Sequence, residues 1–324
     1  MAKKHAVPET MRAAVLERFG GPEVLDMRTL PVPELGALDV LIAVHDAGVG
    51  SWDDDMRKGW SPSGRTHFPV VLGSDGSGTI AAIGAQVSRF AVGDRVYAYS
   101  FDNPKGGFYA EYVAVPATNA AHIPKPLDFE HAGALPAIGL TALQGIEDAL
   151  GIERGEHLLI HGASGGVGSL AIQFAKLRGA HVLASASGRD GVKLALRLGA
   201  DVAIDGHRDD IYAAAARFAP GGVDAILALA GGPELDECLA ALRPGGRVAY
   251  PNGIEPEPRR HKGTKIVAYD AEGGVHEFER LNRAVTAARL RVPIAATYPL
   301  SESRRAHKEL ARGHVLGKIA LRVR

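Results

Sequence analysis

The chain has 324 residues, 46% of them hydrophobic, and its 37 basic residues balance its 37 acidic residues. This length accommodates two domains of ordinary size, and the balanced charge excludes a basic field that would attract nucleic acid or an anionic membrane surface. No apolar run reaches the length of a membrane span and the first residues do not resemble a secretory signal, so we expect a cytoplasmic protein.

The first third of the chain reads as short strands separated by turn residues. The strand candidates are residues 11–16, 40–44, 78–83, 95–99 and 110–115. This pattern predicts a β-rich domain. Within it, Asp53, Asp54 and Asp55 form an acidic run, which we interpret as a solvated loop rather than a catalytic group.

From about residue 134 to residue 270, strand patterns alternate with helix patterns. The strand candidates are residues 158–161, 182–185, 202–204, 225–229, 247–250 and 266–269. Six strands that alternate with helices predict an α/β fold with a doubly wound parallel sheet. The single cysteine, Cys238, falls in one of the helix patterns, and we expect a buried thiol that forms no disulfide.

A glycine-rich turn follows the first strand of this alternation and leads into a helix pattern. The turn consists of Ala163, Ser164, Gly165, Gly166, Val167 and Gly168. Small residues let the backbone approach a pyrophosphate, and the free N–H groups and dipole of the helix N-terminus receive its negative charge. A tight structural turn in another kind of α/β protein is the alternative, but the whole strand–turn–helix–strand unit favours a dinucleotide site.

The end of the second strand indicates which dinucleotide binds. An acidic residue there would bind the ribose 2′-hydroxyl of NAD, whereas this chain has Ser187 and Arg189, which suit the 2′-phosphate of NADP. We interpret Asp190 as the start of the next helix, and an ordinary exposed side chain is the alternative interpretation of Arg189. Asn252 and Gly253, which follow shortly after the strand candidate 247–250, complete the predicted cofactor-binding residues.

The last segment carries a helix pattern and then a short strand. The helix pattern consists of Phe278, Leu281, Val285 and Leu290, and the strand candidate is residues 319–321. We expect the strand to return to the first domain. Strand 266–269 should be the uncovered edge of the parallel sheet, and pairing with the same edge of a second copy would satisfy its backbone groups, so we predict a homodimer.

Several short segments, each modest alone, stand in a specific order. They are residues 11–15, 20–25, 72–78, 92–96, 107–112 and 139–142, the glycine-rich turn, and residues 242–247 and 313–319. In these segments the chain resembles the medium-chain dehydrogenase/reductase superfamily, specifically its zinc-independent quinone oxidoreductase branch. The resemblance covers nearly the whole chain.

The resemblance implies a domain plan and a reaction. A GroES-like β-rich catalytic domain would comprise residues 1–130 and 272–324, with a Rossmann NADP-binding domain at residues 131–271. The active site would lie between the two domains. The reaction would be hydride transfer from NADPH to a quinone or a conjugated enone.

The candidate active site lacks the residues of a zinc dehydrogenase. By resemblance, the positions of the catalytic cysteine and histidine hold Gly50 and Ser74, and neither side chain is a normal zinc ligand. One cysteine cannot build the four-cysteine structural site, and His45, His67 and His131 lack close ligand spacing. We therefore expect no metal, and without a Lewis acid alcohol oxidation is disfavoured.

Enone reduction requires a donor for the charge that grows on the carbonyl oxygen. Quinone reductases commonly carry an asparagine and a tyrosine at the positions of Gly50 and Asp55, so the donor must be another group. We predict Ser51, Thr141 or water as the donor, and Gly50, Trp52 and Trp60 as the substrate pocket. The alternative for Thr141 is a helix residue packed under the glycine-rich turn.

These observations predict an NADPH-dependent, zinc-free reductase of quinones or α,β-unsaturated carbonyls. Its partners would be a small-molecule substrate and a second copy of the chain, without nucleic acid or membrane. An NADPH-binding sensor or structural protein without physiological catalysis is the alternative, because the familiar asparagine is missing. A zinc alcohol dehydrogenase is a weaker one.

Overall fold

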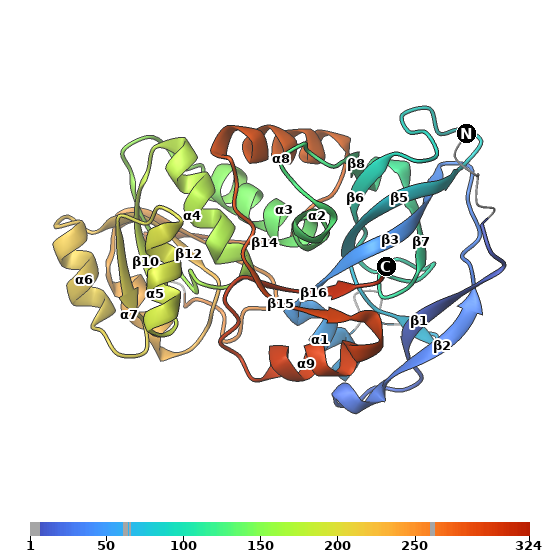
Figure 1. Ribbon diagram of the computed structural model, residues 1–324. Coiled ribbons are helices and arrows are strands. Elements are labelled where there is room, and N and C mark those ends of the chain that lie inside the picture. Colours follow the sequence, from blue (N-terminus) through green and yellow to red (C-terminus); the bar gives the residue numbers. More distant parts are fainter. Residues whose placement is uncertain (1–6, 61–63, 65, 260–262) are drawn as a thin grey trace.

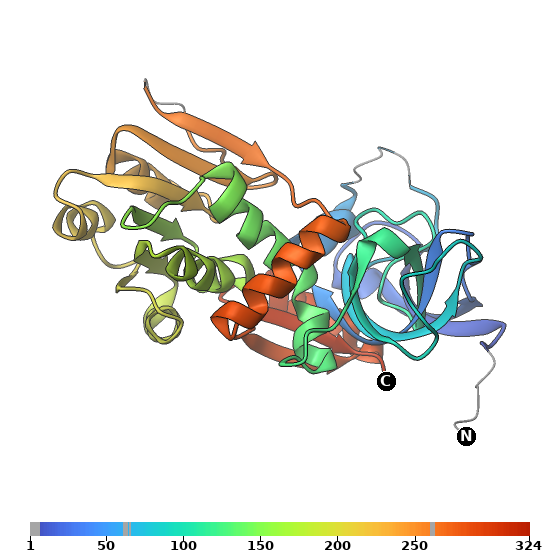
Figure 2. The ribbon, with the colours of Figure 1, turned by 90° about the horizontal axis from the view of Figure 1, so that it is seen from above.

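The computed structural model describes residues 7–60, 64, 66–259 and 263–324. They form a β-rich unit and an α/β unit that lie side by side (Figure 1; Figure 2).

The β-rich unit contains two sheets. The smaller has the strand order β2-β1-β4, with bounds Leu25–Pro31, Thr10–Leu16 and Val70–Val71. The larger has the order β15-β16-β3-β5-β6-β8, and β7 also pairs with β3. Its strands are β3 (Asp39–Val49), β5 (Asp75–Ile83), β6 (Arg95–Tyr99), β7 (Tyr112–Pro116), β8 (Ala120–His122), β15 (Ile294–Pro299) and β16 (Lys318–Arg322).

The α/β unit is built on a six-stranded parallel sheet with the order β11-β10-β9-β12-β13-β14. The bounds are β9 (His157–His161), β10 (His181–Ala186), β11 (Val202–Asp205), β12 (Val223–Ala228), β13 (Leu242–Pro251) and β14 (Lys265–Tyr269). The predicted doubly wound parallel sheet is therefore confirmed. The strand order reverses between β9 and β12, and open sheets of this kind bind ligands at the carboxyl ends of the strands there.

Nine helices connect and cover these sheets in the described part of the chain. They are α1 (Ser51–Lys58), α2 (Phe129–Ala134), α3 (Pro136–Gln144), α4 (Gly166–Arg178), α5 (Gly188–Arg197), α6 (Ile211–Phe218), α7 (Pro233–Ala240), α8 (Val275–Ala288) and α9 (Ser303–Ala311). Short 3-10 turns lie at Pro22–Val24, Ala117–Asn119 and Leu300–Glu302, and a π-helical turn at Gly145–Ala149 extends α3.

The burial of side chains agrees with the positions of β9 and α7 in the fold. Leu158, Leu159 and Ile160 of β9 are fully buried, as expected of a central strand covered on both faces. Cys238 is buried on α7, as predicted, and burial raises the pKa of its thiol to about 12. A thiol in this state is inert.

Some elements differ from the sequence predictions. Strands β2, β4, β8 and β15 were not among the strand candidates, and the candidate 247–250 belongs to a longer strand, Leu242–Pro251. The tail returns as expected, because β16 pairs antiparallel with β3, Ile319 opposite Val49. Helix α8 packs against α3 and α4 and also against β8, so the domain boundaries stay a prediction.

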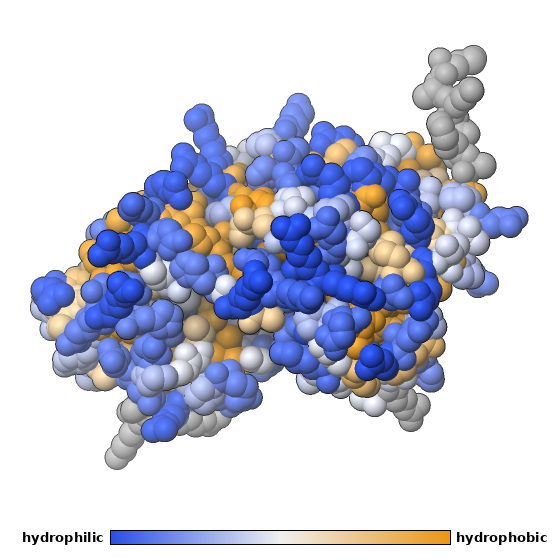
Figure 3. All heavy atoms as spheres, turned by 60° about the horizontal axis from the view of Figure 1, so that its bottom comes forward, coloured by the Kyte–Doolittle hydropathy of each residue, from blue (hydrophilic) through white to orange (hydrophobic). Residues whose placement is uncertain are grey.

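No helix in the described part of the chain is long and apolar enough to span a membrane. On the face drawn in Figure 3, hydrophilic side chains surround small hydrophobic patches.

Candidate nucleotide and substrate site

The glycine-rich turn joins β9 to α4, as predicted. Gly162 has a φ of +80°, and its N–H donates to the carbonyl oxygen of Ser185 over 3.1 Å. A Cβ on Gly168 would lie 2.4 Å from the carbonyl oxygen of Gly162 and 2.6 Å from the Cα of Ala163. Only glycine therefore lets α4 approach the turn this closely.

The other side of the turn is open. A Cβ on Gly165 would meet only the Gly162 oxygen, at 3.6 Å. The N–H groups of Gly166, Val167 and Gly168, in the first turn of α4, have no partner within the helix. This arrangement fits the pyrophosphate of a dinucleotide.

Two of the predicted cofactor-binding residues in the turn are buried and contact neighbouring segments. Ala163 is fully buried, and Ser164 is 4% exposed. The Ser164 hydroxyl accepts the N–H of Ser187 over 3.2 Å, and its carbonyl oxygen accepts the N–H of Gly317 over 2.9 Å. Ser164 thus ties the turn both to the end of β10 and to the C-terminal tail.

A cavity of about 600 Å³ lies where β10 and β11 end. It is lined by Ser187, Gly188, Arg189, Asp205, His207 and Arg208. Arg189 is exposed and has no ion-pair partner among the described residues, and the Nε of Arg208 lies 3.7 Å from Asp205. Two guanidinium groups and a hydroxyl at this position suit a ribose 2′-phosphate.

The neighbourhood of Ser187 includes a residue from the tail. The Ser187 hydroxyl lies 3.0 Å from Nδ1 of His314, whose Nε2 lies 3.0 Å from a carboxylate oxygen of Asp190. Asp190 lies in the first turn of α5, where it was expected.

Asn252 and Gly253 follow β13 at the same end of the sheet. The Asn252 side chain donates to Asp270 over 2.7 Å, and Gly253, with a φ of +91°, has no atom within 4 Å of where a Cβ would stand.

The acidic run is not a loop, and its interpretation as solvated was wrong for two of its three residues. Asp53 and Asp54 lie on α1 and are 0% and 8% exposed, whereas Asp55 is exposed. Asp53 accepts the N–H of Gly50 over 2.8 Å and that of Gly73 over 3.1 Å. The run folds as an amphipathic helix because two of its carboxylates find internal donors.

Asp53 belongs to a buried chain of hydrogen bonds. The Nε of Arg57 donates to Nδ1 of His307 over 3.3 Å, so Nε2 carries the proton and faces the Tyr109 hydroxyl at 3.2 Å. That hydroxyl donates to Asp53 over 3.4 Å. Burial raises the pKa of Asp53 to about 7 and lowers that of His307 to about 4.

The predicted pocket residues lie in different surroundings. A Cβ on Gly50 would come within 2.3 Å of the Trp52 ring, so the indole fills the space that a side chain at position 50 would need. Ser51 is exposed, and Trp60 is 51% exposed with its ring 5.9 Å from that of Phe101. The structure brings Gly50 and Trp52 together, and Trp60 lies beyond the end of α1.

Thr141 is 9% exposed on α3, and its hydroxyl donates to the carbonyl oxygen of Ala137 over 2.8 Å. This geometry corresponds to the packed-helix alternative. The proton of the hydroxyl is directed to the helix backbone and is unavailable to a ligand in this arrangement.

The residues at the expected zinc positions do not fit the metal. Gly50 offers no side chain, and Ser74 is 3% exposed with a hydroxyl that is a poor zinc ligand. Within the described ranges, no three His, Cys, Asp or Glu side chains come close enough together to hold a metal ion.

Sequence reasoning missed two groups of residues. His207 and Arg208 line the cavity at the ends of β10 and β11, and His314 contacts Ser187 beside it. The signal for the first two was their place shortly after a strand candidate. Asp75 and Lys318 lie inside segments that carried the family resemblance, but no chemistry was assigned to them. Both are buried polar residues, at 0% and 3% exposure.

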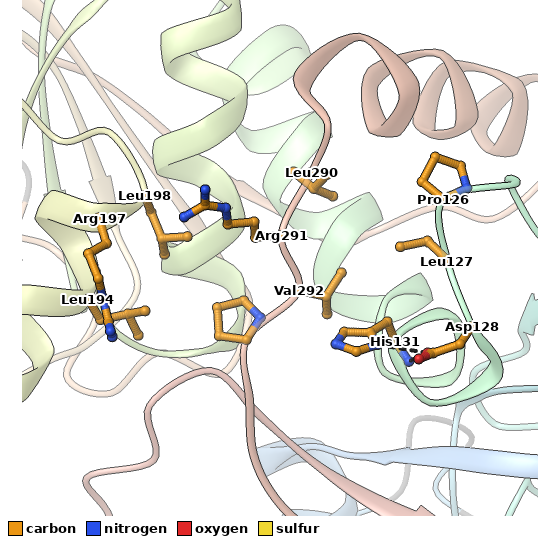
Figure 4. Close-up of a pocket in the computed structure, with 11 residues that line it drawn as sticks. Pro126, Leu127, Asp128, His131, Leu194, Arg197, Leu198, Leu290, Arg291 and Val292 are labelled. Atoms are coloured by element: carbon orange, nitrogen blue, oxygen red, sulfur yellow. Dashed lines mark hydrogen bonds and ion pairs between the residues drawn. The ribbon is translucent and has the colours of Figure 1, made fainter.

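A second cavity, of about 470 Å³, lies between α5, the segment 290–293 and the segment 126–131 (Figure 4). Its lining is mainly apolar, with Arg197, Arg291, Asp128 and His131 as the ionisable members. None of the predicted site residues lines it, so we assign it no part in the site.

Comparison with known proteins gives the following matches. Residues 36–125 match the alcohol dehydrogenase GroES-like domain, and residues 166–257 match the zinc-binding dehydrogenase family. The quinone oxidoreductase of Mus musculus is 32% identical over 320 residues, which are 94% of this chain and 95% of that protein.

Solved structures agree over almost the full length. A structure described as an NAD-dependent alcohol dehydrogenase has a TM-score of 0.90 at 32% identity, covering 97% of this chain and 100% of its own. A mycobacterial protein solved in complex with NADPH has a TM-score of 0.86 at 28% identity, with the same coverage.

Proposed function

Because this chain belongs to the medium-chain dehydrogenase/reductase superfamily, in its quinone oxidoreductase branch, we propose that it is an NADPH-dependent reductase of quinones or α,β-unsaturated carbonyls. It would act without zinc. The observation that carries this proposal is the pair Gly50 and Trp52. Where a zinc-dependent member needs a cysteine, this chain has no side chain, and an indole fills the space.

The nucleotide would be held by the residues already described. The pyrophosphate would lie on the open side of the turn at Gly165, at the N-terminus of α4. The 2′-phosphate would lie in the cavity with Ser187, Arg189 and Arg208. NADPH would supply a hydride that forms the new C–H bond at the β-carbon of an enone, while the π electrons move to the carbonyl oxygen and NADP⁺ is left. Water would then supply the proton at the α-carbon.

The decisive experiment follows the hydride. The purified protein is given NADPH carrying deuterium on the nicotinamide, together with a panel of quinones and enones, and the products are analysed by mass spectrometry and NMR. The expected result is deuterium at the β-carbon of the reduced enone. A protein that binds NADPH but reduces none of the panel would favour the sensor alternative. Stoichiometric zinc together with oxidation of saturated alcohols would instead favour an alcohol dehydrogenase.

Replacing Arg189 with alanine is expected to weaken NADPH binding by roughly tenfold to a hundredfold, because a charge-assisted phosphate contact contributes about 1.5–3 kcal/mol. NADH binding should be nearly unchanged, since NADH lacks the phosphate. Arg208→Ala should act in the same direction. Fluorescence titration with both nucleotides measures the effect, and Arg217→Ala, an exposed arginine on α6, is the matched control. Equal affinity of the unmodified protein for NADPH and NADH would contradict this assignment.

We also propose a homodimer that forms through β14. This strand is the edge of the parallel sheet, paired only with β13 among the described residues, and its Ile266 and Val267 are only half-buried. Val267→Pro removes one backbone donor and should shift the protein toward the monomer in light scattering at micromolar concentration. Circular dichroism checks that the variant is folded. A monomeric unmodified protein, or a dimer unaffected by the proline, would argue against this interface.

A further inference from the structure

A buried ammonium group lies beside the glycine-rich turn without an acceptor. The Lys318 side chain is 3% exposed, and its Nζ has no hydrogen-bond partner in the described part of the chain. It lies 4.2 Å from the ring centroid of Trp52. The indole face and the charges of the buried carboxyl groups of Asp53 and Asp75 attract the ammonium, but none of them accepts a hydrogen bond from it.

Two polar atoms near Lys318 also lack a hydrogen-bond partner among the described residues. The Nε1 of Trp52 and the Oδ1 of Asp75 are buried and have no partner among the described residues. A Cβ on Gly48 would lie 2.4 Å from Asp75 Oδ1 and 2.9 Å from Lys318 Cε, so the carboxyl group and the lysine stem meet over the bare backbone of Gly48. Unmet polar atoms are rare in protein interiors, and three in one place indicate a site for a polar ligand.

The position of the lysine relates this site to the nucleotide. The preceding residue, Gly317, pairs with Gly165 of the glycine-rich turn and donates its N–H to Ser164 over 2.9 Å. Trp52 is partly exposed, whereas Lys318 is buried beneath it.

The other candidate donors are already engaged. Arg57, the other fully buried cationic side chain in the described ranges, is bonded to Gly20, Asp54 and His307. The Thr141 hydroxyl donates to its own helix, and Ser51 is exposed. Among the described residues of this site, the unpartnered buried donors are the Lys318 ammonium and the neutral N–H of Trp52, and only the ammonium carries a positive charge.

We propose that Lys318 is a catalytic residue that stabilises the negative charge formed on the substrate's carbonyl oxygen. This inference rests on the proposed function. When the new C–H bond forms at the β-carbon, the C=C electron pair shifts to join the α-carbon to the carbonyl carbon, and the C=O π pair moves onto that oxygen. The Lys318 ammonium donates a hydrogen bond to the oxygen and keeps its own protons, and the proton for the α-carbon comes from water. The Trp52 face holds the ammonium in place.

Kinetics of the Lys318→Met variant test this role, because methionine removes the charge and fills similar space. With saturating NADPH and an enone, kcat should fall by roughly a hundredfold or more, as when an oxyanion donor is removed. The Kd for NADPH should stay within about twofold of the unmodified value. Lys308→Met, at an exposed position on α9, is the matched control and should leave kcat unchanged. A raised Kd for NADPH with kcat intact would overturn the proposal, because the lysine would then serve the cofactor phosphates.

A second measurement requires no turnover. 4-Nitrophenol is bound to the protein loaded with NADP⁺, and the phenolate absorbance is recorded against pH. An ammonium at the oxygen site should lower the apparent pKa of the bound phenol in the unmodified protein, and Lys318→Met should abolish the shift. Absence of the shift in the unmodified protein would overturn the proposal.

The two measurements separate two possible failures. A protein that ionises the phenol through Lys318 but reduces neither enones nor quinones supports the oxyanion site and refutes the proposed function. A protein that reduces enones equally well with methionine at position 318 refutes the role of the lysine alone.

Discussion

Replacing Gly168 with alanine is expected to weaken both the fold and NADPH binding. The added Cβ would stand 2.4 Å from the Gly162 oxygen, which is backbone and cannot rotate away, so the turn or α4 must shift. Overpacking of this kind costs about 1–3 kcal/mol of unfolding free energy. The displaced helix N-terminus should also raise the Kd for NADPH at least tenfold, because a loss of about 1.4 kcal/mol of binding free energy raises a Kd tenfold. Urea unfolding and fluorescence titration measure the two effects.

Gly165→Ala separates the two contributions. Gly165 has ordinary extended backbone, and its Cβ would meet only one atom, at 3.6 Å, so stability should be unchanged. NADPH should nevertheless bind at least tenfold more weakly, because the methyl group occupies the open side of the turn. If Gly165→Ala binds NADPH as tightly as the unmodified protein, the pyrophosphate does not lie on that side and the assignment of the turn is wrong.

The second large effect concerns the pH dependence of stability through His307 and Asp53. Burial holds the pKa of His307 at about 4, below its ordinary value of 6.5. As the pH falls from 6.5 toward 4, the unfolded chain binds a proton at this histidine and the folded chain does not. The free energy of unfolding therefore decreases over this interval. His307→Gln stays neutral at every pH. Relative to the unmodified protein, it should therefore gain about 1–3 kcal/mol of unfolding free energy over this interval.

Asp53 should give the opposite slope. Burial raises its pKa from 3.8 to about 7, so its contribution is present below pH 3.8 and is lost as the pH rises through 7. Asp53→Asn removes this ionisation, and its stability relative to the unmodified protein should rise with pH over that window. Urea unfolding at a series of pH values tests both variants, with His276→Gln, at an exposed position on α8, as the control. If the free energy of unfolding of both variants changed with pH in the same way as that of the unmodified protein, neither group would titrate as its burial requires.

The sequence by itself determined the parts that depend on local pattern. Alternating strand and helix signals fixed the parallel sheet, and the small residues at positions 163–168 fixed the turn, because a turn and the helix after it are specified by neighbours in the chain. The sequence also predicted that Ser187 and Arg189 lie together at the end of the strand after the turn, where they line one cavity. Their role in binding NADP stays a prediction.

Only the tertiary structure decided which polar residues are buried together. Asp53 looked like part of a solvated acidic run until its two backbone donors and Tyr109 were placed around it. Lys318 and Asp75 are 243 residues apart in the chain numbering and meet over Gly48 only because β16 returns to pair with β3. The physical reason is that burial and charge pairing depend on contacts between distant segments, and local residue pattern carries no information about those contacts.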